Sequence, residues 1–211
     1  MTARELSTIA KSLTHILPEF TIGGPLIFKT TPPGILLGLH CGQSSRDSRI
    51  LRLNAFFLPL FVPTDVIHFN YGKRISSISG QWNADSPNLI NDLIEAIRVE
   101  AIPFLQKVST LTGALNYLKA SVESNGQSVN PHTLEALAYT LIESGEYPSA
   151  MKVLVEQKQL LEGATVPWMI ELKARAQLIE ERLSESPETA LAQLEAWKEE
   201  TKRKLKLDKY S

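Results

Sequence analysis

The stretch GILLGLHCGQSSRDSRILRLN, residues 34–54, decides the fold of this 211-residue chain. Two runs rich in Ile and Leu flank the polar segment GQSSRDS. A connection this short joins antiparallel strands, because parallel strands need a crossover of about a dozen residues or more. Similar apolar segments at 19–30, 48–62 and 65–76 are separated by Pro, Gly, Ser and Asp clusters. We therefore predict an antiparallel sheet of three to five strands.

Helical patterns precede and follow the predicted sheet. Apolar residues recur every three or four positions from Leu6 to Leu17, and the same period returns near Ser86 and continues to the end of the chain. A polar linker at 121–131 interrupts the second pattern. The predicted fold class is α+β, with an N-terminal helix on the sheet, followed by an α-helical hairpin array. The predicted domains are an α+β domain at 1–124 and an all-helical hairpin region at 125–211.

The segment after the linker has the most informative spacing in the chain. Apolar and small residues lie at matching positions in NPHTLEALAYTLIESGEYPSAMKVLVEQKQLLEG, namely Leu134, Leu137, Ala138, Leu141, Gly145, Tyr147, Ala150 and Leu154. By this spacing, residues 131–164 resemble a single tetratricopeptide-type helical hairpin. The segment departs from that pattern at Leu134, Gln157 and Glu162, where the repeat usually has tryptophan, a small residue and proline.

A fainter resemblance covers residues 5–120. A helix, an antiparallel sheet, the run FNYGKRIS, Trp82 and the helical stretch AIPFLQKVSTLTGALNYL resemble uncharacterised bacterial domains of unknown function. Such families bring no established activity, so this resemblance implies no catalytic residue.

Composition favours a cytoplasmic protein. One cysteine cannot form an internal disulfide, and the N-terminus MTARELSTIAKSL lacks the apolar block of a secretion signal. The longest apolar run, AFFLPLFV, is much shorter than the roughly 20 residues that span a membrane. We expect no membrane association.

Charge is unevenly distributed although the net charge is only −1. Residues 131–200 carry 6 basic and 13 acidic groups, which makes nucleic acid an unexpected partner for this half. The sheet region holds a basic cluster of Arg46, Arg49, Arg52, Lys73 and Arg74. We expect this cluster to face the acidic helices of the same chain or of a protein partner. The alternative is that it attracts nucleic acid, although the aromatic residues near it are mixed with aliphatic ones as in core strands.

No catalytic residue, metal site or cofactor is expected. Adjacent strand residues point to opposite faces, so His40 cannot readily activate Cys41, which is expected to be a buried apolar residue. The other histidines, His15, His68 and His132, show no paired ligand spacing, and no glycine-rich phosphate loop is present in the sequence.

One polar set remains a candidate ligand site. If the strands pair suitably, alternation brings five polar residues to one face of the sheet: His40, Arg52, Asn54, His68 and Asn70. Such a face binds an anion through arginine, with histidine available for proton transfer. The alternative is an ordinary solvated sheet face.

The preferred function is a non-enzymatic protein-protein interaction module, acting through a protein partner or self-association. In the repeat-like segment, the first-helix positions expected to be exposed are His132, Glu135, Tyr139 and Ile142. A second hypothesis is a small-molecule or anion-binding protein or enzyme that uses the polar sheet face. A third, an accessory role in bacterial toxin immunity or phage defence, is compatible with the fainter resemblance.

Overall fold

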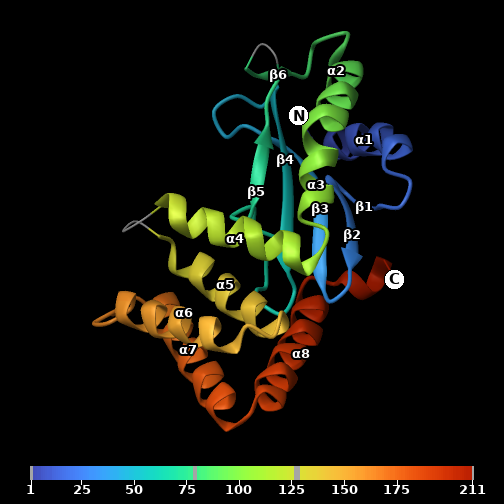
Figure 1. The fold of residues 1–211 in the computed structure, drawn as a ribbon. Helices are drawn as coiled ribbons and strands as arrows, with labels where there is room; N and C mark the ends of the chain where they lie inside the picture. Colours follow the sequence, from blue (N-terminus) through green and yellow to red (C-terminus); the bar gives the residue numbers. More distant parts are fainter. Residues whose placement is uncertain (1, 78–79, 126–128, 211) are drawn as a thin grey trace. The chain divides into compact units, whose positions relative to one another are not determined.

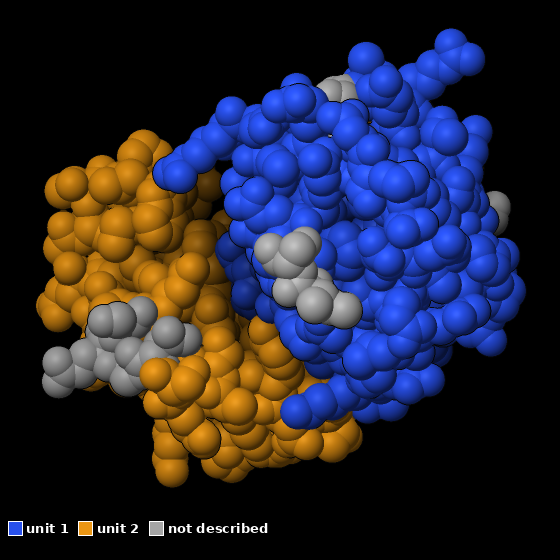
Figure 2. Space-filling view, turned by 90° about the horizontal axis from the view of Figure 1, so that it is seen from above, with its two compact units in different colours: residues 1–58, 68–110, 210–211 blue, residues 59–67, 111–209 orange. Residues whose placement is uncertain are grey.

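A computed structural model describes residues 2–77, 80–125 and 129–210, with Asn125 and Tyr210 described by their backbone alone. The predicted α+β class is confirmed: an N-terminal helix, an antiparallel sheet and several helices follow one another along the chain (Figure 1). Two compact units, coloured separately in Figure 2, comprise residues 1–58, 68–110 and 210–211, here called the sheet unit, and residues 59–67 and 111–209, here called the helical unit. The domain limits 1–124 and 125–211 stay predictions, and residues 126–128 of the predicted linker lie outside the described residues.

Within the described residues the sheet has six strands, one more than the upper limit of the predicted three to five. The strands are β1 Thr21–Gly23, β2 Leu26–Thr31, β3 Ile35–Gln43, β4 Ile50–Pro59, β5 Gly72–Ile75 and β6 Trp82–Asn83. They lie in the order β1-β2-β3-β4-β5, with β6 paired to β4. The two sides of the sheet therefore end in strands of two to four residues, and β5 carries the exposed Lys73 and Arg74.

The registers of the paired strands assign side chains to the two faces of the sheet. Lys29 lies opposite Leu37 and Ile27 opposite Leu39, so these four residues share one face, which packs against helices. Phe28 lies opposite Gly38 on the other face, and Leu26 lies opposite His40. A Cβ on Gly38 would lie 2.7 Å from the Phe56 ring, so Phe56, and with it Asn54 and Arg52 two and four residues earlier in β4, share the face of His40.

Helices of the sheet unit cover the Leu37 face. They are α1 Ala3–Leu13, followed by the turn η1 Thr14–Ile16, and the continuous run α2 Leu89–Ala96, η2 Ile97–Ala101 and α3 Ile102–Lys107. The backbone widens to a π-helical turn at η2, immediately before Pro103 in the first turn of α3. Since proline has no N–H, it cannot donate a helical hydrogen bond, and the wide turn before it accommodates it within the continuous helical run.

The predicted strand at 65–76 is mostly wrong. Only Gly72–Ile75 pairs with β4, and the preceding residues are irregular. Thr64 explains the early break: its hydroxyl donates to the Val66 carbonyl at 2.9 Å and accepts from the Val66 N–H at 3.3 Å. Such local side-chain bonds compete with the ladder, and Pro63 has no N–H to offer it.

Among its described residues, the helical unit contains five helices, and a short turn that follows them ends at Tyr210 in the sheet unit. They are α4 Leu111–Asn125, α5 Pro131–Glu143, α6 Tyr147–Leu160, α7 Pro167–Glu185, α8 Pro187–Lys204 and η4 Leu207–Tyr210. Helices α5 and α6 are joined by a tight turn in which Gly145 has φ 76°, the left-handed conformation that favours glycine. Helix α5 is central, because it packs against α4, α6, α7 and α8.

Within the described residues, no helix combines the length and the apolar character needed to cross a membrane.

Candidate functional site

The Cys41 thiol has little nucleophilic reactivity. Its side chain is completely buried, as the strand pattern predicts, and burial raises the pKa of the thiol to about 12. Almost no thiolate therefore exists at neutral pH, and the thiolate is the nucleophilic form.

We expect a thiol reagent such as DTNB to leave the native chain unmodified and to modify one cysteine per chain after denaturation in urea. The absorbance of the released thiolate, followed over time, measures both. Stoichiometric labelling of the native chain within minutes would contradict the buried position of Cys41.

His40 lies on the opposite face and is covered by an aromatic side chain. Its ring stacks on Phe69, with centroids 4.7 Å apart and an interplanar angle of 21°. Phe69 in turn meets Phe56 edge to face at 5.2 Å. Burial lowers the pKa of His40, and its Nδ1 atom is buried with no hydrogen-bond partner among the described residues. The ring is therefore neutral at pH 7.

This burial predicts that the chain loses stability in mild acid. The unfolded chain binds a proton at His40 below its ordinary pKa of about 6.5, whereas the folded chain resists protonation there. The contribution is present above pH 6.5 and is lost as the pH falls, by at most about 1.4 kcal/mol per pH unit. The free energy of unfolding, measured with urea from pH 7.5 to 5, should depend less steeply on pH for His40→Gln than for the wild type.

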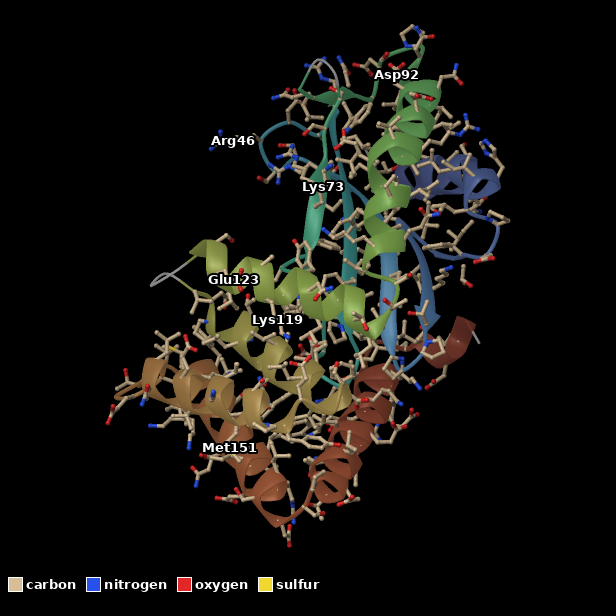
Figure 3. All side chains as sticks on the ribbon, in the orientation of Figure 1. Arg46, Lys73, Asp92, Lys119, Glu123 and Met151 are labelled. Carbon is tan, nitrogen blue, oxygen red and sulfur yellow. The ribbon has the colours of Figure 1, made fainter. Side chains whose placement is uncertain are left out.

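Arg52 is the cation of this face. Its Nη2 atom donates to the Ser44 hydroxyl at a long 3.4 Å, and its Nε atom is buried with no partner among the described residues. Asn54 lies opposite Arg74 in the β4–β5 register, which brings a second arginine to the same face. Arg46 extends outward from the β3–β4 loop (Figure 3).

Strand pairing brings together only part of the predicted polar set. His40, Arg52 and Asn54 share a face, but His68 and Asn70 belong to no strand, because the ladder begins only at Gly72. His68 meets the Tyr71 ring edge to face at 5.2 Å, and Asn70 is exposed. Ligand binding by the five residues stays a prediction.

The basic cluster is partly neutralised within the sheet unit. Lys73 forms an ion pair with Glu100 at 2.7 Å. Arg49 lies 3.7 Å from Asp47 and 3.9 Å from Asp85. These acidic partners lie in the sheet unit and not in the acidic segment 131–200, so the expected pairing of the cluster with acidic helices stays a prediction.

The expected exposure of α5 is wrong for three of its four candidate positions. Glu135, Tyr139 and Ile142 are completely buried, and only His132 is partly exposed. The physical reason is the central position of α5: helices surround it, so the surface that lines an open groove in a repeat array is filled here. Binding of a partner by these residues stays a prediction.

Instead, α5 supplies a buried ionic cluster that includes Arg175 of α7. The Arg175 Nε atom lies 2.7 Å from Glu135 Oε1, and its Nη2 atom lies 3.2 Å from Oε2. Tyr139 donates to Oε1 at 3.4 Å, and His132 Nδ1 lies 3.8 Å from Oε2. Burial and the Glu135 charge raise the pKa of Tyr139 well above its usual value. Burial lowers the pKa of Arg175, but Glu135 outweighs it and raises that pKa overall.

An exposed apolar corner was missed by the sequence reasoning. Of seven large apolar side chains exposed in the described part of the chain, four lie where α6 ends and α7 begins: Leu160, Val166, Trp168 and Ile170. We call these four residues the α6–α7 corner. Trp168 is 45% exposed and stacks on His132, with centroids 5.2 Å apart. The run VPWMI is the signal that could have identified it.

The described residues contain no group of three or more His, Cys, Asp and Glu side chains close enough to hold a metal ion.

Comparison with known proteins identifies no relative. No protein-family model, no curated protein and no solved structure matches this chain.

Proposed function

We propose that this protein is a non-enzymatic interaction module that binds a protein partner through the α6–α7 corner of its helical unit. The carrying observation is the indole of Trp168, which is 45% exposed in a segment of the chain that also holds the exposed apolar residues Leu160, Val166 and Ile170. Single exposed aliphatic residues are ordinary, whereas an exposed tryptophan held by stacking on a neighbouring ring is typical of the residues that dominate binding at interfaces. The α5–α6 hairpin supports the proposed likeness to a tetratricopeptide-type unit, and the single cysteine supports a cytoplasmic setting.

The corner is held by the buried cluster beneath it. Trp168 stacks on His132, which lies 3.8 Å from Glu135, and Glu135 binds Arg175 on the same helix as Trp168. Because α7 is thus fixed to α5, the indole is presented in a set position. A fixed aromatic anchor loses little conformational entropy when it binds.

Charge specifies the partner's chemistry. Residues 131–200 carry seven more acidic than basic groups, and exposed Glu162 and Glu171 lie within the turn and the first turns of α7. Like charges repel across an interface, so the complementary partner is a protein segment with an apolar anchor flanked by lysine or arginine.

The test compares partners cross-linked in cells by the wild-type chain, by Trp168→Ser/Ile170→Ser and by Val99→Ser. Val99 is 63% exposed on the sheet unit and serves as the matched control. A basic partner that binds the wild type and Val99→Ser, and that the double variant loses, supports the proposal. A set of partners identical for all three chains refutes it.

The exposure of Trp168 can be tested separately by quenching of tryptophan fluorescence. Trp82 and Trp197 are 6% and 9% exposed, so Trp168 should provide most of the fluorescence that acrylamide quenches. We expect Trp168→Phe to lower the Stern–Volmer quenching constant by at least about half. An unchanged constant would contradict the exposed position of the indole.

A second candidate function, anion binding on the His40 face, is favoured by one observation. The buried Nε atom of Arg52 has no hydrogen-bond partner among the described residues, and buried donors normally have one. Titration with inorganic phosphate tests it: saturable binding that Arg52→Met abolishes and Arg46→Met retains supports an anion site, and absence of binding refutes it.

A further inference from the structure

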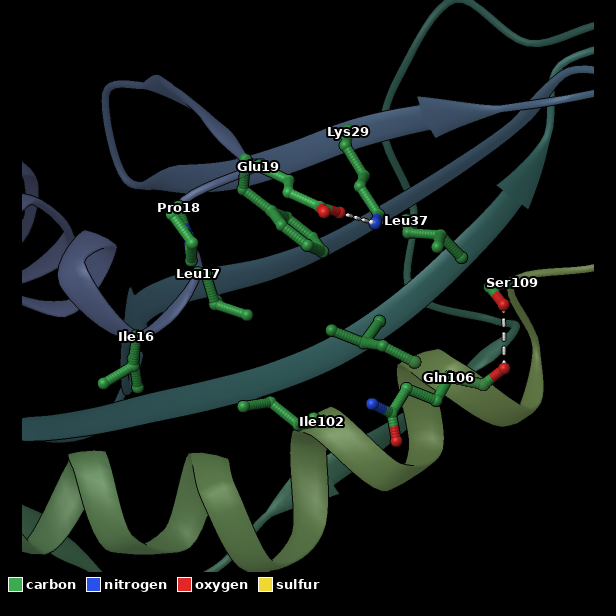
Figure 4. A pocket seen from close by; sticks show the side chains of 11 residues that line it. Ile16, Leu17, Pro18, Glu19, Lys29, Leu37, Ile102, Gln106 and Ser109 are labelled. Carbon is green, nitrogen blue, oxygen red and sulfur yellow. Dashed lines mark hydrogen bonds and ion pairs between the residues drawn. The ribbon is translucent and has the colours of Figure 1, made fainter.

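A small apolar pocket lies within the sheet unit, at the edge of the helix-covered face. It has a volume of about 270 Å³ and opens to solvent between the β2–β3 ladder, the turn after α1 and helix α3 (Figure 4). Its floor is formed by Leu17, Leu37, Ile102 and Leu105. Three of these side chains, Leu17, Leu37 and Leu105, are buried, so the pocket is a hollow in the core and not a groove between mobile surface groups.

Two local features of the backbone keep this space open. On one side, the chain leaves α1 through η1 and reaches Pro18, so no helix continues over β2. On the other, the π-helical turn η2 ends immediately before Ile102, and Pro103 follows in the first turn of α3, the helix that supplies Ile102 and Leu105. Wide helical turns are frequent at functional sites.

The mouth of the pocket carries one cation, and a carboxylate is already bound to it. Among the lining residues Lys29 is the only basic one, and its Nζ atom lies 2.8 Å from Glu19 Oε2. Lys29 projects from the same face as Leu37, its partner in the β2–β3 register. The Glu19 side chain is 77% exposed, and the hydrogen bond from Lys29 lowers its carboxyl pKa.

We propose that this pocket binds a small amphipathic carboxylate, whose apolar tail fills the hollow and whose carboxylate replaces Glu19 on Lys29. The Lys29–Glu19 pair shows where a ligand's carboxylate is held, and the exposed Glu19 can swing into solvent. A cavity of about 150 Å³ holds benzene, so 270 Å³ holds about ten non-hydrogen atoms. Medium-chain fatty acids and short arylalkanoic acids have this size.

The proposal predicts opposite effects for the two members of the ion pair. Glu19→Gln removes the competing carboxylate and should tighten binding of octanoate about fivefold, because exposed ion pairs contribute little more than this. Lys29→Met removes the charge that holds the ligand and should weaken binding about tenfold. Lys107→Met changes an exposed lysine that does not line the pocket, and should leave the affinity unchanged.

The experiment titrates the full chain with sodium octanoate, 1-octanol and sodium acetate, using calorimetry and amide chemical shifts. Saturable octanoate binding that shifts the amides of Leu37, Gln106 and Ser109, together with weaker binding of octanol and acetate, supports the proposal. The opposed responses of Glu19→Gln and Lys29→Met are required as well.

Three results would overturn it. They are no saturable octanoate binding by either the wild type or Glu19→Gln, equal affinities for octanoate and octanol, or an affinity that both variants leave unchanged. Glu19 is exposed, so Glu19→Gln should fold, which circular dichroism verifies. The pocket contains no residue of the α6–α7 corner, so this test and that of the proposed function fail independently.

Discussion

Replacement of Arg175 by methionine is expected to lower the free energy of unfolding by about 3 kcal/mol, at the low end of the cost of breaking a buried ion pair. Glu135 is 1% exposed in its side chain, whereas Arg175 is 23% exposed. The variant leaves the buried Glu135 carboxylate without its guanidinium partner, and the Tyr139 hydroxyl beside it is uncharged because its pKa is raised well above the usual value. Urea unfolding monitored by circular dichroism measures the loss.

Two further variants separate this effect from ordinary surface electrostatics. Arg182→Met breaks an exposed pair with Glu185, in which both side chains are about half exposed, and should cost no more than about 0.5 kcal/mol. Glu135→Leu combined with Arg175→Met removes both charges and should recover at least half of the loss. If Arg175→Met and Arg182→Met cost the same, the cluster is not the anchor of α7 that we describe.

Substitution of Gly72 by alanine is expected to cost about 3 kcal/mol, the upper end for overpacking in a core. A Cβ there would lie 2.6 Å from the Ala55 carbonyl oxygen and 3.2 Å from the Phe56 Cα atom. These are backbone atoms of the long strand β4, which is paired on both sides, so they cannot move aside as a side chain would. Thermal and urea unfolding of Gly72→Ala measure the cost.

Gly24→Ala provides the comparison for a glycine without close neighbours. Gly24 has φ 65° and nothing within 4 Å of its Cβ position, so alanine there should cost only the left-handed backbone strain, about 1 kcal/mol. Equal losses for the two variants would show that close approach to β4 does not explain Gly72.

The fold was predictable where hydrophobic period and turn residues agree. The β3–β4 hairpin follows from two apolar runs around GQSSRDS, and the α5–α6 turn follows from Gly145. The segment before β5 was not predictable in the same way, because its alternation of Ile67, Phe69 and Tyr71 looks like a strand. The hydrogen bonds between the Thr64 hydroxyl and the backbone of Val66 compete with strand pairing. The alternation of apolar residues does not reveal these bonds.

The candidate sites were harder to predict because they depend on contacts between distant residues. The alternation of residues predicted that Cys41 is buried and that His40, Arg52 and Asn54 lie on strands. The stacking of His40 on Phe69 could be recognised only in the structure. We expected Glu135, Tyr139 and Ile142 to be exposed because the corresponding helix face is open in a repeat array. Here α7 and α8 pack against α5, and the three side chains are buried. Arg175 lies 40 residues from Glu135, so no local pattern links them.

The short outer strands of the sheet bear on how the protein behaves at high concentration. β1 spans three residues, and β5 spans four with two consecutive basic side chains. A long, flat and uncharged edge strand can pair with a strand of a second molecule. Such pairing is the first step toward amyloid-like assembly. These borders are short, and charged side chains on a border strand disfavour pairing with a second molecule, so we expect crowded copies of the chain to resist joining edge to edge.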